Sequence, residues 1–193
     1  MRNSIVGFIP AREGSKSITL KNIKPILGRP LISWTIDALL NSKCEKVYIY
    51  TDSTKIRNTV MDTFQGERIE VLDRPPETAT DYATSESGLI DFCSRIDSDI
   101  IVFVQATSPL IEAKYIDEGI NYVMNEFDSA ISVTKQKRFI WEENKDISYP
   151  VNYDINNRPR RQDFDGFFVE NGAFYISKRD AILKTKSRIS GKI

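Results

Sequence analysis

The sequence predicts a three-layer α/β/α domain built on a mostly parallel sheet. Short apolar runs alternate with amphipathic segments along the 193 residues, a length that suits one domain with a sizeable core. The run Ile100–Val104 contains only apolar and aromatic residues without alternation, which is typical of a strand buried on both faces of a parallel sheet. The β-α-β-α order then implies right-handed crossover connections between neighbouring strands.

The strands are expected where short apolar runs are bounded by polar or turn residues. They are Ser4–Ile9, Lys46–Thr51, Arg68–Leu72, Ile100–Val104, Ser129–Val133 and Phe168–Ile176.

The helices are expected where apolar residues recur at helical spacing. They are Pro30–Asn41, Thr54–Phe64, Ala83–Ile96, Glu112–Phe127 and Lys178–Lys184. The first of these begins with a proline, which is favourable in the first turn of a helix. Cys93 shares one face of its helix with Leu89 and Ile96, so we expect a buried thiol rather than a nucleophile.

The alternation of apolar strands with amphipathic helices stops between residues 135 and 167. We interpret this stretch as an excursion from a single domain that spans 1–193. This stretch carries charges and four aromatic residues without a clear helical pattern: Phe139, Trp141, Tyr149 and Tyr153. Two interpretations remain open, a partner surface and a long loop that covers part of the core.

The composition excludes several classes of chemistry. The chain has 27 basic and 27 acidic residues, so no net charge attracts nucleic acid or a membrane surface. It contains no histidine, which removes histidine triads, bases and metal ligands. Cys44 and Cys93 lack metal-ligand spacing and suit the reducing cytoplasm. We expect neither a membrane span nor a signal peptide.

The segment from Phe8 to Ile23 is the strongest functional signal. A strand runs into a loop that carries Arg12, Lys16 and Lys21 but lacks the glycines of a dinucleotide fingerprint or a P-loop. Taken alone, the loop fits a solvated basic turn as well as a phosphate site.

Further polar residues follow the other predicted strands, and ligands of open α/β sheets bind at this carboxyl edge. They are Thr51-Asp52, Arg74, Asp81 and Ser85, Gln105 to Pro109, and Arg160, Arg161 and Gln162 before Glu170-Asn171-Gly172. Asp52 and Asp81 also suit helix caps, and capping is the favoured interpretation of Asp52. Cations from three separate loops favour a triphosphate site beside an acidic substrate.

Four motifs in order identify a resemblance that covers about Ile5 to Ile176. They are P-A-R-E-G-S-K-S-I-T-L-K-N-I, R-P-P-E-T-A-T-D-Y-A-T-S-E-S, Q-A-T-S-P-L and R-R-Q-D followed by E-N-G-A-F-Y-I. The chain resembles the acylneuraminate cytidylyltransferases, or CMP-sialic acid synthetases. The resemblance implies a Rossmann-like nucleotidyltransferase domain, a homodimer with 135–167 as the dimerisation excursion, and transfer of CMP from CTP to the anomeric hydroxyl of a 2-keto sugar acid.

The resemblance also assigns roles to individual residues. Arg12 and Lys21 would bind the CTP phosphates as the catalytic cations, with Lys16 beside them, while Asn22, Arg74 and Ser85 would bind the nucleotide. Gln105, Arg161 and Tyr175 would bind the sugar acid, with Arg161 as a bidentate partner of its carboxylate. Arg161 is preferred to Arg160, which faces the opposite side in an extended stretch.

The divalent cation implied by the resemblance is Mg²⁺ or Mn²⁺. The family's principal metal-binding aspartates lie in a D-I-D-like segment that would follow Ile193, so we expect no metal ligand in this chain beyond a possible accessory role of Asp52, and we expect a fragment or a truncated product. Ser17, Ala106 and Ile111 depart from the family pattern and affect the expected substrate preference.

Alternatives are a synthetase for a legionaminic, pseudaminic or Kdo-type acid and an inactive nucleotide-binding subunit. Thr107-Ser108 disfavours the Kdo type, which carries an acidic residue there.

Overall fold

The computed structural model describes residues 3–15, 17–66 and 68–193, which form two compact units. One unit takes in the chain up to Ile131 together with Gly172–Ile193, and the other comprises Ser132–Asn171. The units are described separately below.

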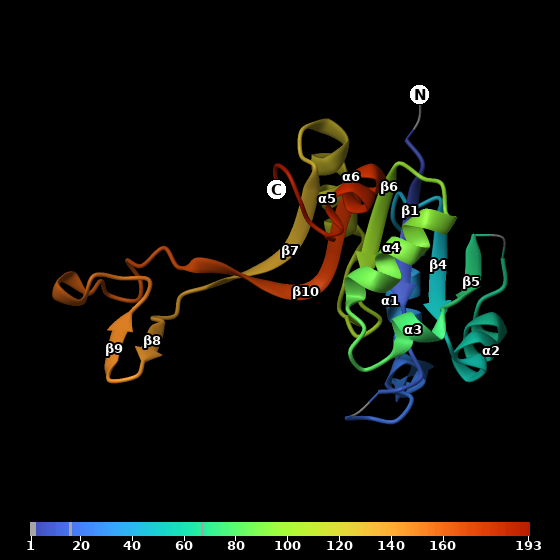
Figure 1. The fold of residues 1–193 in the computed structure, drawn as a ribbon, viewed down its shortest axis with the longest axis horizontal. Helices are drawn as coiled ribbons and strands as arrows, with labels where there is room; N and C mark the ends of the chain where they lie inside the picture. The colour runs from blue at the N-terminus through green and yellow to red at the C-terminus, as the bar shows by residue number, and fades with distance from the viewer. Residues whose placement is uncertain (1–2, 16, 67) are drawn as a thin grey trace. The chain divides into compact units, whose positions relative to one another are not determined.

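The first unit is built on a six-stranded sheet in the order β5-β4-β1-β6-β10-β7 (Figure 1). The bounds of these strands are Ile5–Pro10 for β1, Lys46–Thr51 for β4, Ile69–Asp73 for β5, Ile100–Val104 for β6, Ser129–Gln136 for β7 and Phe167–Lys178 for β10. The residues of β7 after Ile131 and those of β10 before Gly172 belong to the second unit. The pairs β1·β4, β1·β6 and β4·β5 are parallel, whereas β10 runs antiparallel to β6. All five residues of β6 are buried, as their unbroken apolar run predicts.

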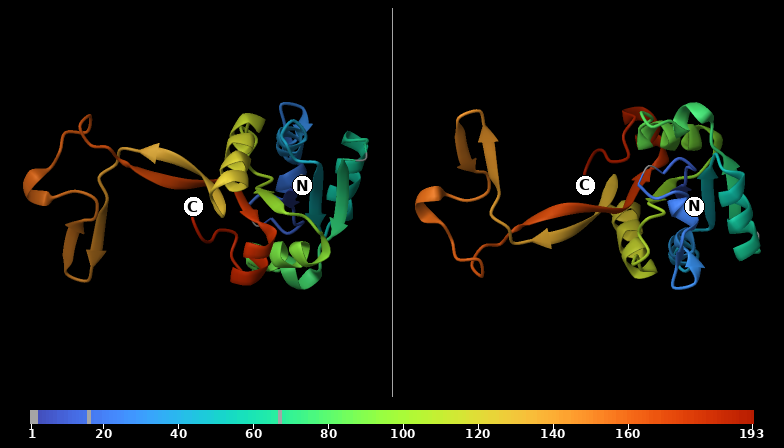
Figure 2. Two further views of the ribbon diagram at one scale, coloured as in Figure 1. Left: turned by 90° about the horizontal axis from the view of Figure 1, so that it is seen from above. Right: turned by 90° about the horizontal axis from the view of Figure 1, so that it is seen from below.

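Helices cover both faces of this sheet and enclose two apolar cores (Figure 2). Helices α1 (Leu31–Leu40), α2 (Thr54–Thr63) and α5 (Ala113–Asn125) contribute to one core. Helices α4 (Ser85–Arg95) and α6 (Arg179–Thr185) contribute to the other, which contains the buried Cys93. The predicted three-layer fold with a mostly parallel sheet is therefore confirmed.

The favoured interpretation of Asp52 as a helix cap is wrong, and Asp81, for which capping was one alternative, does not cap α4. Ser53 rather than Asp52 caps α2, because its side chain accepts a hydrogen bond from the Ile56 amide. Thr84 rather than Asp81 caps α4 and accepts from Ser87. Both caps are hydroxyls that directly precede the first helical residue, whereas the two carboxylates bond to neighbouring loops.

Several short elements were not predicted. They are the 3₁₀ helix Lys21–Ile23 (η1), the strands β2 (Pro25–Ile26) and β3 (Arg29–Pro30), and the one-turn helix α3 (Pro76–Ala79). All four lie in loops after β1 and β5. Each is too short to produce a periodic apolar pattern.

The second unit contains a hairpin where an irregular excursion was predicted. Strands β8 (Trp141–Asn144) and β9 (Ile147–Pro150) pair antiparallel, and a short 3₁₀ helix, η2, covers Ile155–Asn157. Seven of the eight hairpin residues are exposed, so no alternation of buried and exposed positions marks the strands in the sequence. Phe139 packs against Tyr153 and Phe164, and the Arg158 guanidinium lies 4.5 Å from the Phe139 ring centroid.

None of the helices in the described residues is both long and apolar enough to cross a membrane.

Candidate active site

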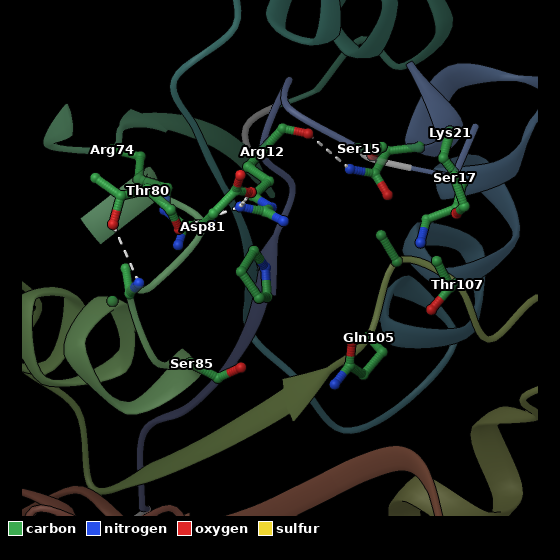
Figure 3. Close-up of a pocket in the computed structure, with 15 residues that line it drawn as sticks. Arg12, Ser15, Ser17, Lys21, Arg74, Thr80, Asp81, Ser85, Gln105 and Thr107 are labelled. Carbon is green, nitrogen blue, oxygen red and sulfur yellow. Dashed lines mark hydrogen bonds and ion pairs between the residues drawn. The ribbon is translucent and has the colours of Figure 1, made fainter. Parts of the chain in front are cut away.

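A cavity of about 430 Å³ lies beside the carboxyl ends of β1 and β6 in the first unit. Its walls come from three stretches of chain that are far apart in the sequence (Figure 3). The lining residues are Pro10, Arg12, Ser15, Ser17, Lys21 and Asn22 from the first stretch, Arg74, Thr80, Asp81, Ala83, Ser85 and Gly88 from the second, and Gln105, Ala106 and Thr107 from the third.

The loop after β1 is held in place by a buried amide. Asn22 is 6% exposed, and its Nδ2 donates to the Arg12 carbonyl at 3.1 Å. The Glu13 amide donates to Asp52 Oδ1 at 3.0 Å, which joins the loop to the end of β4. Both contacts fix the peptide unit that joins Arg12 to Glu13, so the Arg12 side chain extends into the cavity from a held backbone.

Arg12 faces the opposite wall of the cavity. Its Nη1 donates to the Thr80 carbonyl at 3.1 Å and to Asp81 Oδ1 at 2.9 Å. The close-up places Arg12 and Asp81 between Lys21 on one side and Arg74 on the other (Figure 3). The cavity thus combines several cations with one carboxylate on its wall, an electrostatic setting suited to an anion that competes with Asp81 for Arg12.

Arg74 lines the cavity in the second stretch of chain, and its guanidinium is partly shielded from water. Its Nε donates to Thr78 Oγ1 at 3.3 Å, and its guanidinium lies 5.6 Å from the centroid of the Tyr50 ring. Burial lowers the pKa of Arg74, but an arginine remains charged at neutral pH. Burial also raises the pKa of Tyr50 to about 12, so the phenol stays protonated and donates to Asp91 Oδ2 at 2.8 Å.

The described residues do not supply a complete magnesium site. Mg²⁺ in nucleotide sites is usually bound by one or two carboxylates besides the phosphates. Nowhere in the described ranges do three acidic or cysteine side chains cluster as ligands, and Asp81 at the cavity is already paired with Arg12.

The cavity brings together most of the residues singled out in the sequence. Arg12, Lys21, Asn22, Arg74, Ser85 and Gln105 all line it. Lys16 lies outside the described residues. Arg161 is exposed in the second unit, where the neighbouring Arg160 pairs with Asp163. Tyr175 is 8% exposed in the core of the first unit, packs against Phe103 and Arg188, and is not among the lining residues.

Sequence reasoning missed the contribution of Tyr50, Thr80 and Gly88. Thr80 and Gly88 line the cavity, and Tyr50 supports Arg74 from behind. The available signal was the glycine inside the amphipathic helix α4. Glycine at such a position costs helix stability, so its presence indicates that another group approaches the helix closely.

The arrangement agrees with a comparison against known families. The Cytidylyltransferase family profile matches residues 6–189. The chain belongs to this cytidylyltransferase family. An N-acylneuraminate cytidylyltransferase of Oncorhynchus mykiss is 37% identical over 188 residues, and one of Streptococcus agalactiae is 33% identical over 188 residues. The predicted resemblance is thereby confirmed.

The matched region is 94% and 93% of this chain but only 43% and 45% of those two cytidylyltransferases. The chain thus spans less than half the length of the curated relatives.

Solved cytidylyltransferase structures share the fold. A CMP:2-keto-3-deoxy-manno-octonic acid synthetase complexed with CTP superposes with a TM-score of 0.70 at 18% identity, covering 98% of this chain and 80% of that one. A 4-diphosphocytidyl-2C-methyl-D-erythritol synthase from Anaerococcus prevotii gives 0.69 at 15% identity, covering 98% and 78%.

Proposed function

We propose that the protein transfers CMP from CTP to the anomeric hydroxyl of a sialic-acid-like 2-keto sugar acid. The observation that carries the proposal is the cavity itself. Six residues expected to bind CTP or the sugar acid line it, although they come from three separate stretches of a chain with no net charge. The N-acylneuraminate cytidylyltransferases at 33–37% identity support the choice of acceptor.

In the proposed reaction, the oxygen of the anomeric hydroxyl attacks the α-phosphorus of CTP, and the hydroxyl proton is released to water. The bond from that phosphorus to the bridging oxygen breaks, and pyrophosphate leaves with the bond electrons. Negative charge builds on the phosphoryl oxygens in the transition state, so fixed cations that are aimed at those oxygens lower the barrier. Arg12 and Lys21 take this role, and Lys16 joins them by its place in the same loop.

The remaining roles follow the chemistry of the groups. Asn22, Arg74 and Ser85 bind the nucleoside part of CTP, and Gln105 donates to the acceptor sugar. Arg161 binds the acceptor's carboxylate through its two-pronged guanidinium, and the buried Tyr175 supports the sugar site from the core.

The proposed function also involves a divalent cation, a second copy of the chain and a reducing compartment. Mg²⁺ or Mn²⁺ accompanies CTP, and Asp52 is the proposed protein carboxylate next to the phosphate loop. The protein acts as a homodimer through 135–167, whose exposed residues include Trp141 and Tyr149. Two free, buried thiols suit the cytoplasm.

Two measurements on the purified protein test this function. Calorimetry with CTP measures binding, and a pyrophosphate-release assay with MgCl₂ and a panel of nine-carbon and eight-carbon sugar acids measures turnover. We expect micromolar to millimolar CTP binding and release only with the nine-carbon acids. A folded protein that fails to bind CTP contradicts the proposal, and binding without release from any acid indicates an inactive nucleotide-binding subunit.

A further inference from the structure

Tyr50 is a buried residue with an unusual position beside the cavity. It is the penultimate residue of β4 and is 0% exposed, yet its ring lies beneath Arg74, a cation of the cavity wall. Aromatic rings attract a guanidinium through their negative faces, and this attraction grows when water is excluded. The ring therefore restricts Arg74 on the side away from the cavity.

The Tyr50 hydroxyl lies against Thr78 of the one-turn helix α3, which also binds Arg74. It donates to Asp91 Oδ2 at 2.8 Å and lies 3.3 Å from Thr78 Oγ1. Thr78 in turn accepts from Arg74 twice, at its hydroxyl from Nε and at its carbonyl from Nη2. A continuous set of contacts thus runs from α4 through Tyr50 and Thr78 to Arg74.

Gly88 leaves room for this arrangement. A Cβ at position 88 would lie 3.2 Å from Tyr50 Cε1 and 3.8 Å from Arg74 Nη2. Glycine in the middle of a helix costs about 1 kcal/mol relative to alanine. Its presence here lets the backbone of α4 approach the ring and the guanidinium closely.

No carboxylate in the described residues forms an ion pair with Arg74, so its orientation depends on these neutral groups. Nη1 has no hydrogen-bond acceptor within the described ranges and is available to a ligand. We propose that Tyr50 is a positioning residue of the nucleotide site, which holds the Arg74 guanidinium in its binding orientation through its ring and through Thr78. The inference rests on the proposed CTP site.

Tyr50→Phe keeps the ring and removes the hydroxyl, while Asp91 retains its contact with Arg95. Tyr48→Phe is the matched control, because Tyr48 is a buried tyrosine two residues earlier in the same strand and does not line the cavity. We expect Tyr50→Phe to weaken CTP binding about threefold to tenfold in calorimetry and to raise KM more than it lowers kcat, since one hydrogen bond is lost. Tyr48→Phe should match the wild type.

A double-mutant cycle separates positioning from a general effect on the fold. In an Arg74→Ala background, Tyr50→Phe should change CTP affinity no further, because the residue through which it acts is gone. A lower midpoint of urea unfolding for Tyr50→Phe than for Tyr48→Phe would reveal a loss of stability. In that case Thr78→Val is the second variant, because it removes the hydroxyl that lies between Tyr50 and Arg74.

Three outcomes would overturn the inference. They are wild-type affinity in both Tyr50→Phe and Thr78→Val, wild-type affinity in Arg74→Ala, and additive losses in the double variant. A folded wild type that fails to bind CTP overturns the proposed function itself and removes the basis of this inference.

Discussion

Arg12 Nη1 donates to the Ala79 and Thr80 carbonyls and to Asp81, so two neutral acceptors and one charged acceptor share a single nitrogen. The carbonyls orient the guanidinium, whereas the carboxylate also repels any anion that enters the cavity. Asp81 is therefore an electrostatic competitor of the triphosphate in the proposed reaction.

Asp81→Asn should strengthen CTP binding about twofold to fivefold, because the repulsive charge is removed while the Thr80 carbonyl still orients Arg12. Calorimetry at low ionic strength measures the change, and about 0.5 M NaCl should reduce it because salt screens the charge. Asp73→Asn is the control, since Asp73 pairs with Arg57 and does not line the cavity. Weaker binding by Asp81→Asn would show that the carboxylate orients Arg12.

Lys21→Ala should lower pyrophosphate release about 10²–10³-fold with the fold intact, because a fixed charge near the transferring phosphate is lost. Lys24→Ala is the control, as Lys24 is an exposed lysine in the same loop and does not line the cavity. Release at the wild-type rate by folded Lys21→Ala would rule out the assigned role.

At the scale of elements, helix α5 packs closely on the antiparallel strand β10. A Cβ at Gly119 would lie 2.7 Å from Ile176 Cδ1 and 3.2 Å from Phe174 Cε2. The glycine thus sets the distance between helix and sheet.

Gly119→Ala should lower the free energy of unfolding by about 1–3 kcal/mol despite the better helix propensity of alanine, because overpacking forces side chains from their rotamers. Urea unfolding measures the loss. Glu118→Ala on the exposed side of the same helix should stay within about 0.5 kcal/mol of the wild type. A stabilised Gly119→Ala would mean that the helix moves at little cost.

The segment after α6 is fastened to α4 by an ion pair. Arg188 Nε donates to Glu86 Oε1 at 2.5 Å, and its guanidinium lies 4.9 Å from the Tyr175 ring centroid and 5.4 Å from that of Phe103. The hydrogen bond from Arg188 lowers the pKa of Glu86 below its ordinary value of 4.5.

Glu86→Gln should cost about 1 kcal/mol of stability at neutral pH. A lowered folded-state pKa means that the stabilisation is complete above the unfolded value of 4.5 and is lost as pH falls through the folded value. Urea unfolding from pH 7 to pH 3 measures the free energy of unfolding of both proteins. The values for the wild type and for Glu86→Gln should converge as the pH falls below about 4.5. A difference that stays constant over this range would contradict the assigned cause.

The long helices and strands were predictable because their apolar residues follow a helical spacing or form an unbroken buried run. The five residues of β6 and the apolar face of α5 that includes Ile116, Ile120 and Val123 are buried as expected. The β8–β9 hairpin was not predictable, since it is stabilised by its turn and cross-strand pairs rather than by a buried face. The cap of α2 was misassigned to Asp52 because Ser and Asp suit the same position.

At the scale of the molecule, six site residues could be expected from motifs that follow strands, because parallel strands end at one edge of the sheet. Tyr50 could not. Its side chain reaches the site from inside the core, where a tyrosine in a strand has the same pattern as any apolar residue. Contacts between segments such as Arg12 and Asp81, which are 69 residues apart, also leave no mark in a single sequence.

The two cysteines report on the folding of the first unit. Burial raises the pKa of Cys44 and of Cys93 to about 12, so neither is a thiolate near neutral pH. Labelling by a disulfide reagent at pH 8 should be slow in the native protein and complete in 6 M guanidinium chloride, with rates that follow global unfolding. Rapid labelling of one thiol under native conditions would reveal local opening of the core that contains it.

All the cavity-lining residues in the described ranges fall between Pro10 and Thr107, within the first 55% of the chain by position, 107 of 193. In the proposed function this segment binds the nucleotide and, through Gln105, part of the acceptor, whereas Arg161 belongs to the later part of the chain. A gene for such a protein would carry its donor specificity upstream and part of its acceptor specificity downstream. Recombination beyond codon 107 would then change the acceptor contact made by Arg161 and leave the proposed CTP site and Gln105 unchanged.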